Sequence, residues 1–143
     1  MFDLSIEDRL SSWAILRTEL ETADDPFQLI FDFWVYAPFV PYNRTIDQYH
    51  QKSWPSPWQI IVDNQYDDFT KALMIAYSLK FTKRFKESVI ELRTIVDKNN
   101  KKYYNIVCID NKWVINYGDN IVILENIPNS FLVENLIEIE ASR

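Results

Sequence analysis

Glycine is almost absent from this chain of 143 residues, in which Gly118 is the only example. Phosphate-binding loops of the G-x-G-x-x-G and P-loop kinds need several glycines, because their backbone amides must approach the phosphate closely. A chain with one glycine contains neither motif. The sequence therefore excludes nucleotide sites built on such loops.

Cysteine and histidine are equally scarce, with Cys108 and His50 the only representatives. Zinc sites built from Cys and His use three or four ligands, so a site of that kind cannot form. A single cysteine cannot make an internal disulfide, which is typical of proteins in a reducing compartment. We expect neither a metal nor a cofactor.

Long apolar runs are also missing, since none approaches the ~18 residues that a membrane-spanning helix needs. The first ten residues, MFDLSIEDRL, are too acidic and polar for a signal peptide. The sequence therefore predicts a soluble intracellular protein with no membrane partner.

The net charge of −6 is distributed unevenly along the chain. Residues 1–70 carry 4 basic and 12 acidic side chains, residues 71–102 carry 9 and 3, and the remainder carries 2 and 6. The basic segment could meet an acidic partner, but its cations also suit the C-terminal end of a helix, which is the favoured interpretation. Its candidate contact residues are Lys80, Lys83, Arg84 and Lys86. Nucleic acid is not the expected partner, because the acidic flanks would repel phosphates.

Apolar spacing and capping residues predict helices in the first half of the chain. Ser5 is a typical N-cap before a helical pattern that extends to about Glu21. Asp25-Pro26 starts a second helix that Pro38 stops. Ser56-Pro57 caps a short turn, and Asp67 or Asp68 caps a further amphipathic helix.

Residues 37–57 form a long connection that holds four of the six prolines and several large aromatic residues. Long loops of this kind are uncommon unless functional or disordered, and the aromatic content argues against disorder. We expect an ordered segment that covers the core. Trp58 is predicted to belong to the core, whereas Trp54 could serve the core or an exposed docking surface. Tyr42 and Tyr49 are further candidate contact residues.

The apolar period changes from 3.6 to 2 after about Lys86, which indicates strands. Four are expected, over residues 90–96, 103–109, 112–117 and 121–124. A final short helix is predicted from Asn129 or Ser130, carrying apolar residues of the segment 131–137. The expected fold class is α+β, a single domain over 1–143 in which N-terminal helices pack on an antiparallel meander.

Catalytic patterns are weak in this sequence. Cys108 lies among β-branched residues with no source of positive charge to lower its pKa, which favours a core thiol. His50 follows Asp47, but no nucleophile is visibly paired with it. A calcium-loop pattern starting at Asp63 lacks the required Gly and Glu. No catalytic residue is therefore assigned.

Two blocks, YDDFTKALMIAYSL and YYNIVCIDNKWVINYGDN, together resemble the core of transglutaminase-like cysteine-protease folds. In that family a Cys opens a helix, a His starts a strand of a later hairpin, and an Asp follows the Trp of that hairpin. Matching Asp68-Phe69 to the family's Asp-Phe, and Trp113 to its Trp, places other residues at the catalytic positions. The Cys position falls on Tyr66 or Asp67, the His position on Tyr104 or Asn105, and the Asp position on Asn116. The resemblance therefore implies a degenerate site without a thiolate for acyl transfer.

The segments SIEDRLSSW, FWVYAPFVPYN and SWPSPWQIIVDNQYDDFTKALMIAY are similar to a family of small proteins of T4-like phages of marine cyanobacteria. This resemblance implies synthesis in the host cytoplasm and brings no activity. The leading hypothesis is a non-enzymatic protein that binds another protein, either as a virion component or as a modulator of a host protein. The alternatives are a hydrolase or transferase with an unconventional site at Asp67, Asp68, Tyr104 and Asn116, and a nucleic-acid-associated protein.

Overall fold

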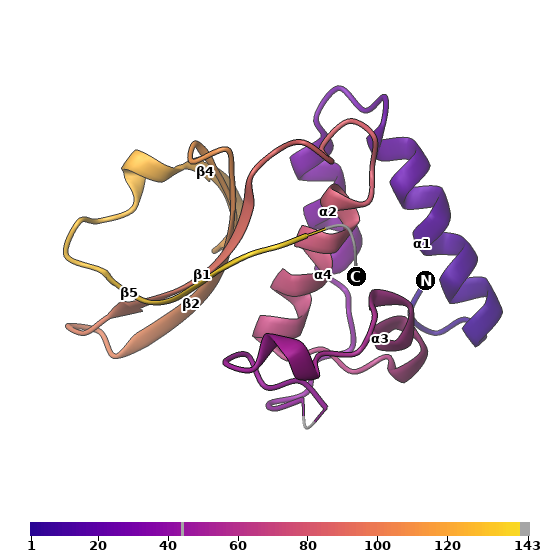
Figure 1. The fold of residues 1–143 in the computed structure, drawn as a ribbon, viewed down its shortest axis with the longest axis horizontal. Helices are drawn as coiled ribbons and strands as arrows, with labels where there is room; N and C mark the ends of the chain where they lie inside the picture. Colours follow the sequence, from indigo (N-terminus) through magenta and orange to yellow (C-terminus); the bar gives the residue numbers. More distant parts are fainter. Residues whose placement is uncertain (44, 141–143) are drawn as a thin grey trace.

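The computed structural model describes residues 1–43 and 45–140, and its architecture is α+β, with the helices first in the chain and an antiparallel sheet after them (Figure 1). The α-helices are α1 (Ile6–Leu20), α2 (Pro26–Trp34), α3 (Pro57–Asp63) and α4 (Asp68–Lys80). Two short 3₁₀ turns are η1 (Gln51–Ser53) and η2 (Leu124–Asn126). The strands are β1 (Ile90–Asp97), β2 (Lys102–Ile109), β3 (Trp113–Tyr117), β4 (Asn120–Ile123) and β5 (Leu132–Glu138).

Each α-helix begins at a side-chain cap. The Ser5 hydroxyl accepts a hydrogen bond from the backbone N–H of Asp8, and Ser56 does the same for Gln59. Asp25 and Asp67 cap α2 and α4 through their carboxylates. These bonds satisfy backbone donors that the helix itself leaves free, which is why the predicted helix starts are confirmed.

The sheet has the strand order β4-β3-β2-β1-β5, and every neighbouring pair is antiparallel. The first four strands form the expected meander. The chain then leaves β4 at one edge, passes through η2 and arches across the sheet to pair β5 with β1 at the other edge (Figure 1).

The predicted final helix is wrong, because residues 132–138 form strand β5. Apolar residues at positions 132, 133, 136 and 137 suit a helix face as well as a strand. What decides between them is the free edge of β1, whose backbone groups β5 satisfies, for example through the pair Leu92↔Ile137. The described residues therefore contain five strands rather than about four.

Both faces of the sheet are covered by apolar residues. The helical layer packs on one face around α4, in which eleven of the thirteen residues are buried. A smaller cluster on the other face comprises Ile95, Ile106, Cys108 and Val114. The connection between β4 and β5 covers this second cluster with residues such as Phe131.

The indole rings of Trp13 and Trp34 meet at one serine in the centre of the helical layer. Both Nε1 atoms donate to the Ser78 hydroxyl oxygen, at 2.8 and 3.2 Å, and both indoles are fully buried. Ser78 in turn donates to the Met74 carbonyl, at 2.6 Å. One hydroxyl therefore joins α1, α2 and α4 in the core.

Candidate functional site

The N-terminus of α4 is the position that the sequence singled out, and Asp67 there has a capping role. Its Oδ1 accepts from the backbone N–H and the hydroxyl of Thr70, at 2.7 and 2.6 Å. Its Oδ2 accepts from the backbone N–H of Asn43, at 3.2 Å. Asp67 therefore holds both its own helix and the aromatic connection 37–57.

Asp68 instead faces the sheet and forms a cluster with two asparagines, which we call the carboxylate–amide cluster (Asp68, Asn105 and Asn116). Asn105 Nδ2 donates to Asp68 Oδ2 at 3.0 Å, and Asn116 Nδ2 lies 3.5 Å from Asp68 Oδ1. Asn116 Nδ2 also donates to the Asn105 carbonyl at 2.8 Å. A helix start and two neighbouring strands thus contribute one polar side chain each.

A local irregularity in β3 brings Asn116 into this cluster. Strict alternation would place Asn116 on the same face as Val114, away from the helices. The pairing of β3 with β4 shifts register between Val114 and Tyr117, and Asn116 has a positive φ of 73°. Asparagine tolerates this backbone conformation better than most residues, and a bulge re-aims the side chain.

Of the degenerate-site positions predicted from the resemblance, the structure unites only Asp68, Asn105 and Asn116. Tyr66 is 1% exposed in the helical core, and burial raises the pKa of its phenol above the ordinary value. Tyr104 lies on the opposite face of the sheet, with its ring stacked on Phe131 at 6.1 Å between centroids. The helical and strand registers therefore place Asn105, and not Tyr104, next to the start of α4.

The cluster offers a carboxylate and two neutral amides, and it lacks a thiol, an imidazole or a hydroxyl nucleophile. Cys108 is buried on the other face of the sheet, where desolvation raises the pKa of its thiol to about 11. His50 is exposed in the connection before η1. These placements do not assemble a nucleophile and a base at the cluster.

A chain of side-chain hydrogen bonds extends from the cluster along the sheet. The Thr94 hydroxyl donates to Asn105 Oδ1 at 2.9 Å, and Gln48 Nε2 lies 3.4 Å from the Thr94 oxygen. Asn135 Nδ2 on β5 reaches the Gln48 carbonyl at 3.3 Å. The cluster therefore belongs to a polar seam that fastens the aromatic connection to β1 and β5.

Two of the predicted contact residues are not available at the surface. Trp54 is 4% exposed, its Nε1 donates to the Asp47 carbonyl at 2.7 Å, and its ring packs on Phe69. Lys80 is 7% exposed, and its Nζ donates to the Ser88 carbonyl at 2.6 Å. The sequence left Trp54 open between the core and a docking surface, and named Lys80 because it lies in the basic segment. Neither signal reveals that the side chain donates to a backbone carbonyl.

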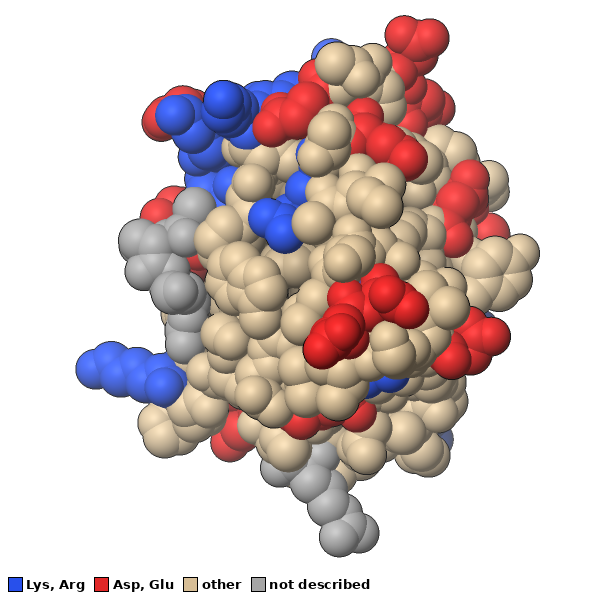
Figure 2. Space-filling model, turned by 90° about the vertical axis from the view of Figure 1, so that its right-hand side faces the viewer, with Lys and Arg blue, Asp and Glu red and all other residues tan. Residues whose placement is uncertain are grey.

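The other predicted contact residues are exposed, namely Tyr42, Tyr49, Lys83, Arg84 and Lys86. The Glu21 carboxylate accepts from the backbone N–H groups of Lys83 and Arg84, and these bonds lower the pKa of Glu21. On the face shown in Figure 2, Lys and Arg gather mainly near the upper left edge, whereas acidic side chains are spread over the rest. Trp58, predicted as a core residue, is partly exposed and packs against Trp13 and Phe81.

Of the three most exposed aromatic residues, the sequence analysis named Tyr42 as a contact residue and missed Tyr36 and Phe39. Tyr36, Phe39 and Tyr42 are 82, 71 and 68% exposed, and they follow one another in the segment after α2. The backbone of this segment is held in place, since Val40 N donates to the Tyr66 carbonyl and Tyr66 N to the Pro38 carbonyl. We call residues 36–42 the aromatic loop. The dense aromatic content was visible in the sequence, but which rings face outward was not.

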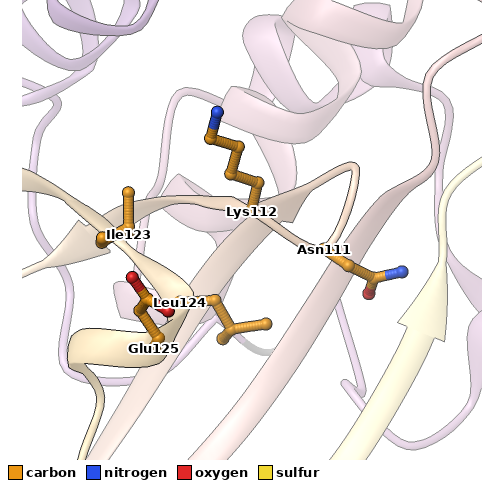
Figure 3. A pocket seen from close by; sticks show the side chains of 5 residues that line it. All are labelled: Asn111, Lys112, Ile123, Leu124 and Glu125. Carbon is orange, nitrogen blue, oxygen red and sulfur yellow. The ribbon is translucent and has the colours of Figure 1, made fainter.

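A hollow of about 200 Å³ lies where the β2–β3 turn meets the end of β4 (Figure 3). Its lining includes Lys112 and Glu125, whose charged groups do not converge, and Asn111 projects away from both. No group of His, Cys, Asp and Glu side chains suited to a metal ion is present among residues 1–43 and 45–140. Within the same ranges, no helix is both long and apolar enough to cross a bilayer.

Comparisons with known proteins provide no relative, because no family model, no curated protein and no solved structure matches this chain.

Proposed function

We propose that this protein is a non-enzymatic binding protein that contacts a protein partner through the aromatic loop. The supporting observation is the exposure of Tyr36, Phe39 and Tyr42, each more than two-thirds accessible on a backbone held by hydrogen bonds. Large aromatic side chains on an ordered surface are enriched among residues that dominate binding energy. The phage resemblance adds the expectation that the partner is a virion or host protein.

The ordered backbone strengthens this proposal. The aromatic loop is attached to the start of α4 through the bridge Phe39↔Tyr66 and through the bond from Asn43 N to Asp67. A surface that is already rigid loses little conformational freedom on binding, so more of the contact energy remains as affinity. The three rings also expose apolar surface to water, which is unfavourable, and burial of this surface by a partner would favour binding.

Replacing Tyr36, Phe39 and Tyr42 together by Ser is expected to abolish capture of a specific partner. Tagged protein expressed in infected cells would be cross-linked and its co-purifying proteins quantified by mass spectrometry. Because these exposed side chains contribute little to the packing of the core, we expect an unchanged far-UV circular dichroism spectrum. The matched control is Tyr103→Ser, which removes a ring that is 63% exposed elsewhere. Equal capture by the triple variant and the wild type would refute the proposal.

The second candidate function is a hydrolase or transferase that uses Asp68, supported by the contact of this carboxylate with Asn105 and Asn116. We expect Asp68→Ala to change the free energy of unfolding by less than about 1 kcal/mol, since the carboxylate is exposed. Wild type and variant would be assayed against p-nitrophenyl acetate, with and without an amine acceptor. Turnover that disappears in a folded Asp68→Ala protein would establish the enzyme and overturn the binding proposal.

A further inference from the structure

Strand β5 provides a second surface, because it is the last strand at one edge of the sheet. It spans seven residues, whereas the strand at the opposite edge, β4, spans four. An edge strand leaves one row of backbone N–H and C=O groups without a sheet partner. The longer edge is therefore the better template for an added strand.

The hydrogen bonds to β1 determine which residues form this outer row. Ile139 N donates to the Ile90 carbonyl, and the register continues through Leu92↔Ile137. In an antiparallel pair the residues between hydrogen-bonded pairs direct their backbone groups to the other side. Leu136 and Glu138 therefore direct their N–H and C=O groups outward. A bulge at Glu134 limits the regular part of the edge to its C-terminal half.

Two of the usual protections of an edge strand, Lys and Pro, are missing from β5, although its bulge and its glutamates remain. Natural edges are blocked by Lys, by Pro or by shortness. The chain has no Lys or Arg from Trp113 to Glu140, and the last proline, Pro128, precedes the strand. Leu132, Val133 and Leu136 are 46, 55 and 46% exposed. Among the described residues, the edge combines backbone groups that have no sheet partner with accessible apolar side chains.

The charged side chains of the strand itself are all acidic, although Lys80 and Lys86 line a hollow together with Glu138 and Glu140. Glu134, Glu138 and Glu140 lie on or directly after the strand, and the Tyr49 hydroxyl donates to Glu134 at 2.8 Å. A hydrogen bond to Glu140 and repulsion from it raise the pKa of Glu138. A second copy of the same strand would bring more carboxylates to this edge, which like-charge repulsion disfavours. Lys or Arg on an incoming strand would be attracted instead.

We infer that the outer edge of β5 binds an extended segment of a partner protein by strand addition, with alternating apolar and basic residues in that segment. Backbone bonds to Leu136 and Glu138 would supply affinity, and the glutamates would select the charge. The inference rests on the proposed protein-binding function but uses a surface separate from the aromatic loop.

The probe is a fluorescein-labelled, N-acetylated hexapeptide of alternating Val and Lys, titrated by fluorescence anisotropy. We expect saturable binding with a dissociation constant below about 1 mM, and hydrogen-exchange protection of the Leu136 and Glu138 amides. The same peptide with N-methyl groups on alternate residues is expected to bind at least about tenfold more weakly, because it cannot donate to the edge. A peptide of alternating Val and Glu tests whether the glutamates of β5 select a basic partner, and it is expected not to bind.

Leu136→Pro removes one outward N–H and leaves the hydrogen bonds of β5 to β1 in place. It is expected to lower the affinity for the Val–Lys peptide at least about tenfold. The matched control Leu136→Thr keeps the N–H and should change affinity less than about threefold. Equal binding of the N-methylated peptide would overturn the inference even if Leu136→Pro fails to fold. A dimer in sedimentation that Leu136→Pro dissolves would overturn it in favour of self-pairing.

The aromatic-loop variant separates this inference from the proposed function. If strand addition is correct, the triple Ser variant binds the Val–Lys peptide as the wild type does. Capture of a partner through the aromatic loop, together with no peptide binding at β5, would contradict the strand-addition inference and leave the proposed function intact.

Discussion

Ser78→Ala is expected to lower the free energy of unfolding by at least about 2 kcal/mol, a large share of the stability of a domain of this size. The substitution leaves the Nε1–H groups of Trp13 and Trp34 without their acceptor, and each buried donor so orphaned costs about 1–3 kcal/mol. Urea unfolding followed by tryptophan fluorescence measures the loss. The m-value should stay unchanged, since the surface exposed on unfolding is the same.

Ser11→Ala is the matched control, because Ser11 is exposed on α1. It is expected to leave stability unchanged or slightly higher, since Ala is the better helix former. A Ser78→Ala protein as stable as this control would show that the two indoles find other acceptors. A water molecule that entered the vacated space and accepted from both indoles would leave stability equally unchanged.

The stability that Cys108 contributes is expected to fall with rising pH between about 9 and 11. Burial raises the pKa of the folded thiol from an ordinary value of 9.0 to about 11. A group whose folded pKa lies above its unfolded pKa stabilises fully below the unfolded value, and this contribution is lost as pH rises through the folded value. The expected slope is about 1.4 kcal/mol per pH unit within that window.

Cys108→Ala supplies the reference, because it retains every other group that titrates in the same range. The difference in unfolding free energy between wild type and variant, measured from pH 8 to pH 11, should shrink along that slope. Below pH 9 the folded thiol should react with an aromatic disulfide reagent at least about 100-fold more slowly than the unfolded thiol. Equal rates would mean that Cys108 is accessible in the folded protein and that burial does not control the reactivity of its thiol.

The helices could be predicted from the sequence because their signals are local. Each cap joins residues three positions apart, as Ser5 with Asp8 and Asp67 with Thr70, so sequence spacing alone reveals them. Strand β5 could not be predicted in this way. Its apolar spacing fits helix and strand alike, and the outcome depends on β1, a distant segment with unpaired backbone groups.

The candidate site was predictable in outline and not in detail. Capping signals led to the start of α4, and only the resemblance pointed to the two strands that face it. The bulge that turns Asn116 toward Asp68 has no spacing signal. Trp54 and Lys80 show a second limit. Residue type left Trp54 open between core and surface and made Lys80 a surface candidate, whereas both side chains donate to backbone carbonyls, those of Asp47 and Ser88.

The arch from β4 to β5 also bears on the order in which the sheet assembles. The hairpins β1–β2, β2–β3 and β3–β4 close over short turns, while β5 meets β1 only after β2, β3, β4 and η2 have been traversed. Closing the longer loop costs more chain entropy, which favours the meander as the earlier structure. Until β5 docks, β1 remains the open edge of the nascent protein. Folding therefore moves the unpaired row of backbone groups from β1 to β5 and does not eliminate it.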